Sequence, residues 1–231
     1  MALSKVNPNF VNQLGRRNLI INGAMKVAQR GTSFTGDHGG SGAYTIDRWK
    51  AWQTGGGDIT IEQSTEVPEE FTGGRSIKGT VATADSSIGA TDYYSVSHYI
   101  EGQNIVGTDF GGATAKTLTL SFYIKTSVTG AYGGVVRNSD GTKNYPFSYV
   151  VADTNWNRYT ITFTGATDGT WLYTNALGLS VFWGLGVGAT YTDTAGSWNT
   201  KASVVSVDSS LNWIATNGAT FYLTGVQLEL G

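Results

Sequence analysis

The stretch TLTLSFYIK, residues 117–125, alternates apolar side chains with hydroxyl-bearing or charged ones over its whole length. Its main apolar members are Leu118, Leu120, Phe122 and Ile124. Because successive side chains of a β-strand point to opposite faces, this period of two predicts a strand with one buried and one polar face. Strands of this kind are typical of the antiparallel sheets of a β-sandwich.

Similar strand patterns recur along the chain between turn sequences. The clearest lie at 59–62, 77–81, 93–100, 145–151, 158–163, 177–187 and 221–230. In the last of these the apolar positions change from odd numbers at Phe221 to even numbers at Val226, which predicts a β-bulge at Thr224-Gly225. We predict an all-β, antiparallel sandwich of roughly ten strands, with no helix beyond a turn near residues 209–214.

The composition excludes several classes of protein. Charged residues make up 14% of the 231 residues, the formal net charge is −2, and there are 32 Gly and only 3 Pro. This balance is typical of turn-rich β-structure and gives no electrostatic footprint for nucleic acid. Because the chain has no Cys, disulfides and thiolate metal sites are excluded.

The stretch NLIINGAMKVAQRGTS, residues 18–33, begins with a short apolar run that ends on Asn22-Gly23, a pair that favours a tight turn. Met25 and Val27 follow at the spacing of a strand, so we expect a first core strand here. A Gly-rich loop then leads to YTIDRW, residues 44–49, which we expect to form a second strand.

The sequences of these two segments, and of FYLTGVQLE at 221–229, resemble the first and last parts of a domain common in virion proteins of tailed bacteriophages. The resemblance implies a jelly-roll-like β-sandwich similar to carbohydrate-binding modules, as found in tail fibres and other appendages. We therefore divide the chain into an N-terminal arm at 1–17 and a jelly-roll domain at 18–231. The motifs identify the domain and not a catalytic site.

The arm, MALSKVNPNFVNQLGRR, lacks the continuous apolar segment of a secretory signal. No run in the chain approaches the roughly 20 apolar residues of a membrane span, so we expect no membrane insertion. One interpretation is a frayed terminus. The other is a virion anchor that buries Phe10 and Leu14 against another virion protein, with Arg16 and Arg17 facing an acidic partner surface.

Catalytic and metal-binding motifs are absent from the sequence: it has no Gly-rich phosphate loop, no metal-binding His motif and no Gly-x-Ser-x-Gly elbow. His98 lies on an apolar strand face and is predicted to be a core histidine. Loops near Asp85, Asp153 and Asp168 contain oxygen ligands for Ca²⁺ but no recognisable ligand spacing. We predict no catalytic residues, no metal and no cofactor.

Aromatic side chains are the candidates for carbohydrate binding, because flat rings pack on the apolar faces of sugars. The candidate residues lie in the segment after Gly169 and in the loop 188–200; they are Trp171, Tyr173, Tyr191, Asp193, Trp198 and Asn199. The alternative for all of them is packing in the core, at the rim or at a subunit interface. Trp49, Trp52 and Trp183 are assigned to the core.

Together these observations favour a non-enzymatic structural protein of a bacteriophage virion, assembled in the host cytoplasm. We expect it to decorate the capsid, or to cap a tail or head appendage, through its N-terminal arm. Its partners are then other virion proteins, and the resemblance implies a homotrimer. The alternative is a receptor-binding adhesin that recognises a host surface polysaccharide. A polysaccharide depolymerase ranks third, because a glycosidase needs two carboxylates across a cleft and the sequence offers no pair to nominate.

Overall fold

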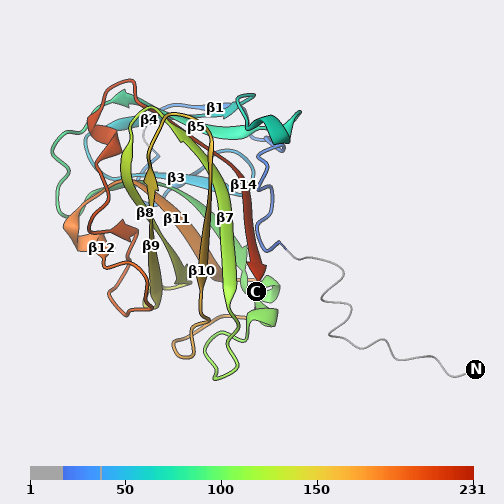
Figure 1. The fold of residues 1–231 in the computed structure, drawn as a ribbon. Helices are drawn as coiled ribbons and strands as arrows, with labels where there is room; N and C mark the ends of the chain where they lie inside the picture. The colour runs from blue at the N-terminus through green and yellow to red at the C-terminus, as the bar shows by residue number, and fades with distance from the viewer. Residues whose placement is uncertain (1–17, 37) are drawn as a thin grey trace, which may run out of the picture.

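A computed structural model describes residues 18–36 and 38–231. Two six-stranded sheets face each other as a β-sandwich (Figure 1). The first sheet has the order β1 (Ser33–Phe34), β4 (Asp58–Ser64), β5 (Ser76–Thr83), β14 (Thr220–Leu230), β7 (Leu118–Thr126) and β10 (Asn157–Phe163). The second has the order β2 (Ala43–Tyr44), β3 (Trp49–Gln53), β6 (Tyr93–Glu101), β11 (Leu177–Val187), β8 (Gly130–Asn138) and β9 (Asn144–Val151).

All strand pairs within the two sheets are antiparallel, and a short parallel pair, β12 (Thr192–Asp193) with β13 (Ser206–Val207), stands apart from them. Of the fourteen strands in the described residues, β1, β2, β12 and β13 have two residues each, which leaves ten longer ones. The predicted fold, an all-β, jelly-roll-like antiparallel sandwich of roughly ten strands, is confirmed.

Five single turns of 3₁₀ helix connect the strands in the described part of the chain: η1 (Glu69–Phe71), η2 (Gly102–Asn104), η3 (Val106–Thr108), η4 (Ala189–Tyr191) and η5 (Trp213–Ala215). The last of them overlaps the turn predicted near residues 209–214. Over residues 18–36 and 38–231, no helix has the length and apolar character needed to span a membrane.

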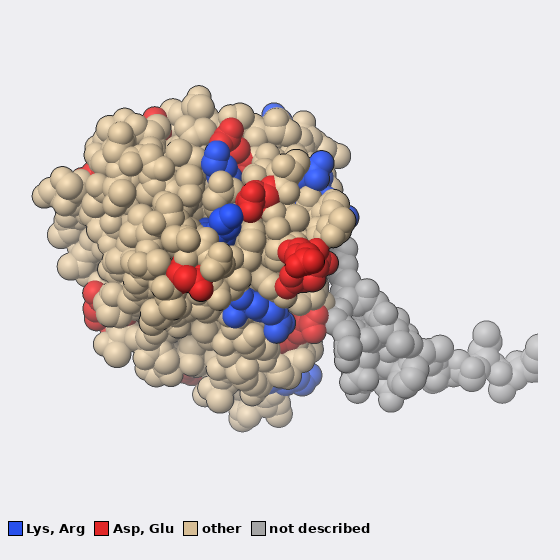
Figure 2. Space-filling view, turned by 45° about the horizontal axis from the view of Figure 1, so that its top comes forward, with Lys and Arg blue, Asp and Glu red and all other residues tan. Residues whose placement is uncertain are grey.

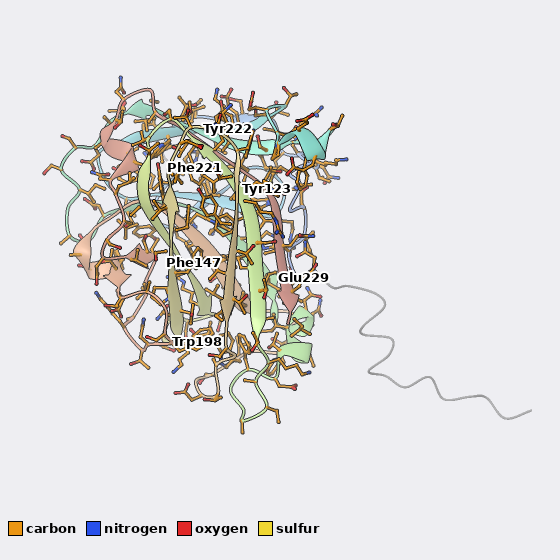
Figure 3. The ribbon with its side chains drawn as sticks, viewed as in Figure 1. Tyr123, Phe147, Trp198, Phe221, Tyr222 and Glu229 are labelled. Atoms are coloured by element: carbon orange, nitrogen blue, oxygen red, sulfur yellow. The ribbon has the colours of Figure 1, made fainter. Side chains whose placement is uncertain are left out.

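The core between the sheets follows the predicted alternation. The four apolar residues of the 117–125 stretch are completely buried, while the side chains between them belong to the outer face. On the opposite sheet, β6 and β11 contribute Tyr94, Val96, His98 and Trp183 to the same core. Figure 3 shows Phe147 and Phe221 within the sandwich. One continuous cluster of apolar side chains therefore holds the two sheets together.

The bulge predicted at Thr224-Gly225 is present. The pairing of β14 with β7 shifts register between Thr224 and Gln227, and Gly225 has φ +59°. Phe221 and Leu223 before the shift, and Val226 and Leu228 after it, all face the core. The inserted residue returns both sets of apolar side chains to one face, as the change of parity required.

The first strand expected at 18–27 does not form, because Asn22 and Met25 adopt positive φ values of 58° and 54°. A chain that enters the left-handed region twice in four residues folds into turns, and Met25 is nevertheless fully buried. YTIDRW is not one strand either. Thr45 and Trp49 pair their backbones across a tight turn in which Arg48 has φ +75°, and this turn joins β2 to β3.

A second, smaller apolar cluster covers the outer face of the second sheet. Trp52, Val135 and Phe182 on the sheet pack against Val204 and Val205, which lie in the segment that carries β12 and β13. Trp49 and Trp183 belong to the main core and Trp52 to this second one, so all three tryptophans are buried as predicted. The predicted arm at 1–17, including Phe10, Leu14, Arg16 and Arg17, lies outside the described residues.

Candidate functional site

A cavity of about 200 Å³ opens at the end of the second sheet, where β6 ends and β11 begins, beside β2. We call it the β6 pocket. It is lined by Tyr44, Arg48, Tyr99, Ile100, Glu101, Asn175 and Leu177. The lining therefore combines two phenol rings, two aliphatic side chains, one amide and one pair of opposite charges.

The turn between β2 and β3 supplies two of these groups. Tyr44 ends β2 with 45% of its surface exposed. Because Arg48 takes a left-handed conformation four residues later, the turn reverses the chain so that Trp49 is buried while Arg48 remains half-buried at the surface. Tyr99 and Glu101 lie on the outward face of β6, where they alternate with the core-facing His98 and Ile100. Strand alternation thus places the ring and the carboxylate on the same side of the sheet.

Arg48 and Glu101 form the polar centre of the β6 pocket. The Nη2 atom of Arg48 lies 2.5 Å from Oε1 of Glu101, and Asn104 donates to the other carboxylate oxygen at 3.1 Å. Burial alone would raise the pKa of the Glu101 carboxyl, but the hydrogen bonds from Arg48, its own backbone and Asn104 hold that pKa below its ordinary value. Glu101 is therefore ionised at neutral pH and accepts hydrogen bonds only.

Lys50 packs against the two tyrosine rings that line the pocket. Its ammonium lies 4.4, 5.0 and 5.2 Å from the ring centroids of Trp52, Tyr99 and Tyr44, and it donates to the Ser41 carbonyl at 2.9 Å. Burial lowers the pKa of Lys50, and within the described residues no carboxylate forms an ion pair with it. Cation–π attraction therefore stabilises this charge and orders the three rings around it.

Burial raises the pKa of the Tyr99 phenol to about 12, so Tyr99 is neutral at physiological pH. Its ring lies 6.1 Å from that of Phe182, over which the guanidinium of the half-buried Arg137 packs at 4.1 Å. Arg137 also donates to the Val204 carbonyl at 3.0 Å. Rings and cations thus alternate from the β6 pocket along the outer face of the sheet, and this packing fixes the position of Tyr99.

The structure brings together three of the six predicted sugar-binding residues, around Phe110. The Trp171 ring lies 4.7 Å and the Trp198 ring 5.7 Å from the Phe110 ring, and the Tyr173 hydroxyl donates to the Phe110 carbonyl. Trp171 is only 8% exposed, and its Nε1 donates to the Asp168 carbonyl. Trp198 lies at the lower end of the sandwich in Figure 3 and donates to the Thr164 carbonyl at 2.7 Å. Trp171 therefore offers no open ring face, and Tyr173 is the one well-exposed ring of the three.

The other three predicted residues lie elsewhere. Tyr191 packs edge-on against Tyr93 at 5.2 Å, Asp193 belongs to β12 and accepts from the Thr194 amide, and Asn199 pairs its backbone with Asn144. The rings of the loop 188–200 take part in packing and backbone pairing fixes Asn199, which agrees with the packing alternative for these residues. A part for any of the six in sugar binding stays a prediction.

The two histidines and the acidic loops have structural surroundings. His98 is completely buried, and its Nε2 donates to the Ile21 carbonyl at 2.9 Å. His38 is also buried, with Nε2 2.8 Å from the Ile59 carbonyl. No cluster of three potential metal-binding side chains exists among residues 18–36 and 38–231. The acidic and basic side chains on the face in Figure 2 are interspersed on a mostly uncharged surface.

No protein-family model matches the sequence, and no curated protein is similar to it in sequence. Its fold, however, is similar to that of solved structures. A candidate sugar-binding protein from Bacteroides thetaiotaomicron VPI-5482 aligns with 93% of this chain and 100% of its own, with 12% identity and a TM-score of 0.50. An arabinose-bound α-L-arabinofuranosidase aligns with 93% of this chain and 26% of its own, with 11% identity and a TM-score of 0.50.

The enzymatically active domain of tailspike protein 4 from bacteriophage CBA120 aligns with 93% of this chain and 22% of its own, with 15% identity and a TM-score of 0.49. This chain thus spans about a quarter of the arabinofuranosidase and about a fifth of the tailspike domain. The likeness is one of fold.

Sequence reasoning missed the β6 pocket. Tyr44 and Arg48 were both quoted in YTIDRW, but the segment was taken as one strand, which would have placed them on the same face as the buried Ile46. The useful signal was Tyr99 and Glu101 on the polar face of a strand whose other face is apolar. Aromatic and acidic side chains on such a face are candidates for contact with a ligand.

Proposed function

We propose that this chain binds carbohydrate in the β6 pocket, as the glycan-recognition module of a bacteriophage surface protein. The observation that carries the proposal is the arrangement of the exposed Tyr44 ring and the Arg48–Glu101 ion pair as walls of one small cavity. A flat ring packs against the apolar face of a sugar, while a fixed donor and a fixed acceptor meet neighbouring hydroxyls.

The polar groups suit a neutral, hydroxyl-rich ligand. Arg48 has donors to spare after its bond to Glu101, and each carboxylate oxygen accepts more than one hydrogen bond. The side chain of Arg48 is 35% exposed and that of Glu101 is 28% exposed, so a ligand reaches both without breaking the pair. Asn175 adds an amide that both donates and accepts.

The pocket lining favours binding over glycoside hydrolysis. Glu101 is the one carboxylate among the seven lining residues, and its lowered pKa opposes the protonated state that a general acid needs. Canonical glycosidases use two carboxylates on opposite sides of the bond. The proposed activity is therefore recognition without cleavage.

The placement on a phage particle rests on the resemblance of residues 18–49 and 221–229 to the domain of virion proteins. We propose a homotrimeric module on the capsid or on an appendage, attached through the arm at 1–17 with Phe10, Leu14, Arg16 and Arg17. In a trimer, three pockets on one particle bind a repetitive polysaccharide together and gain avidity. Recognition of host polysaccharide and a structural place in the virion are then parts of one function.

The test is binding of the full chain to arrays of bacterial surface polysaccharides, with Tyr44→Ala and Tyr173→Ala as matched variants. Both tyrosines are exposed, at 45% and 38%, so we expect both substitutions to leave the fold intact. We expect glycan binding that Tyr44→Ala weakens at least tenfold and Tyr173→Ala retains. Binding that is unchanged by Tyr44→Ala, or that only Tyr173→Ala removes, would place the site at the Phe110 cluster instead.

A further inference from the structure

We infer that the β6 pocket takes one saccharide residue, at a chain end or a branch, and not a segment inside a polysaccharide chain. The inference rests on the proposed function and adds the class of glycan. A sandwich that binds along a chain needs an open groove with several rings in a row, and the described surface is built differently.

The β6 pocket is small for a ligand site. Pockets that bury a drug-sized ligand measure about 300 to 1,000 Å³, and a saccharide of three or more units is of that size. The β6 pocket measures about 200 Å³. It is large enough for one pyranose ring and too small for its neighbours, which must extend into solvent.

The chain segment that carries Asn175 and Leu177 is held in place by backbone contacts. Asn175 and Leu177 form a further wall of the pocket, in a segment of the chain separate from the β2–β3 turn. Their segment is tied to η2 by two backbone hydrogen bonds, from Gly102 N to the Ala176 carbonyl at 2.8 Å and from Gln103 N to the Thr174 carbonyl at 2.7 Å. Gly102 also contacts the backbone of this segment so closely that a Cβ atom there would lie 2.0 Å from the Leu172 carbonyl oxygen. The wall therefore does not swing outward to lengthen the pocket.

Tyr44 is the one well-exposed ring of the β6 pocket, because the Tyr99 ring that also lines it is half-buried. Among the large apolar side chains that are well exposed in residues 18–36 and 38–231, only Tyr44 and Tyr173 are aromatic. Tyr173 does not line the pocket, and its hydroxyl is bonded to the Phe110 carbonyl. A longer saccharide thus gains little from units beyond the first.

The experiment measures affinity against ligand length with the full chain. A panel of methyl glycosides of the common hexoses and their N-acetyl forms is screened by saturation-transfer NMR. The hexose that binds is then compared, by calorimetry, with linear oligosaccharides that end in it and with a cyclic oligosaccharide of the same sugar, which has no chain end. We expect the linear oligosaccharides to bind within about threefold of the methyl glycoside, and the cyclic one not to compete.

Three results would count against the inference in different ways. Affinity that rises tenfold or more from the monosaccharide to the trisaccharide overturns the single-residue pocket, as does competition by the cyclic ligand. A loss of oligosaccharide affinity in Tyr173→Ala, with monosaccharide binding unchanged, would reveal a second subsite and also overturn it. Binding of no carbohydrate of any length would instead overturn the proposed function on which the inference rests.

Discussion

The indole Nε1 of Trp49 donates to the Asn22 carbonyl at 3.1 Å, across 27 residues of sequence. Asn22 in turn donates through its side-chain amide to the Asp47 carbonyl at 2.9 Å. The two segments that carry the resemblance, NLIINGAM and YTIDRW, are therefore joined directly. Trp49 completes the core on one side of the turn, and Arg48 is left to face the pocket on the other.

Tyr44→Ala tests the ring wall of the pocket. We expect carbohydrate affinity to fall by at least tenfold, about 1.4 kcal/mol, because the ring face is the main apolar contact for the sugar. The thermal midpoint should change little, since the side chain is 45% exposed. Calorimetry and thermal denaturation measure the two effects. Tyr44→Phe is the control: it keeps the ring face and should keep the affinity.

Glu101→Gln tests the ion pair. The substitution keeps the shape but removes the charge that holds Arg48 at 2.5 Å. We expect about a tenfold loss of affinity, because both groups then lose their fixed orientation toward the ligand. A double-mutant cycle with Arg48→Met separates a shared contribution from two independent ones. Additive losses in the cycle would show that the pair does not act as a unit.

His98 makes the fold sensitive to acid. Burial lowers the pKa of His98 from 6.5 to about 4, while the hydrogen bond to Ile21 partly opposes this. Between pH 6.5 and 4 the unfolded chain therefore binds a proton on His98 that the folded protein does not bind. The free energy of unfolding is unaffected by His98 above pH 6.5 and falls as the pH drops toward 4. We expect about 2 kcal/mol to be lost between pH 8 and 5. Urea denaturation of wild type and His98→Gln measures it; equal pH slopes for the two would rule this cause out.

Much of the fold was predictable because alternation is a local signal. The 117–125 stretch and the parity change at Thr224-Gly225 each fix which side chains are inside, and the structure confirms them. The segment 18–27 failed because its burial is set by long-range bonds, such as Leu19 N to the Leu228 carbonyl at 2.8 Å, and not by a ladder of its own.

The pocket was not predictable for a related reason. It needs the positive φ of Arg48, which turns a stretch with strand-like composition into a hairpin connection. It also needs three chain segments far apart in sequence, at 44–48, 99–101 and 175–177, to meet at one sheet end. The predicted sugar-binding residues lay instead in ring-rich segments such as the loop 188–200, whose rings pack against other rings of the protein.

Trp198→Ala tests whether that loop is structural. Trp198 contacts the rings of Phe110, Tyr145, Phe163 and Trp171 at centroid distances of 5.5 to 6.0 Å. Removing it leaves a cavity under the loop, so we expect about 3 kcal/mol of destabilisation and unchanged sugar affinity at temperatures where the variant is folded. Chemical denaturation and calorimetry give the two numbers. A stable variant that no longer binds sugar would return the site to this loop.

Gly225→Ala tests the bulge that keeps β14 in register. At φ +59° a Cβ atom there would lie 2.7 Å from Cζ of Phe71 and 2.9 Å from Cδ2 of Tyr123. The matched control is Gly218→Ala, at φ +73° with nothing within 4 Å. The control isolates the cost of the left-handed backbone, about 1 kcal/mol. Gly225→Ala should cost about 1–3 kcal/mol more, because two ring contacts must also shift. Equal destabilisation of the two variants in urea would mean that β14 changes its pairing to avoid the clash, and the bulge would then not be what fixes its register.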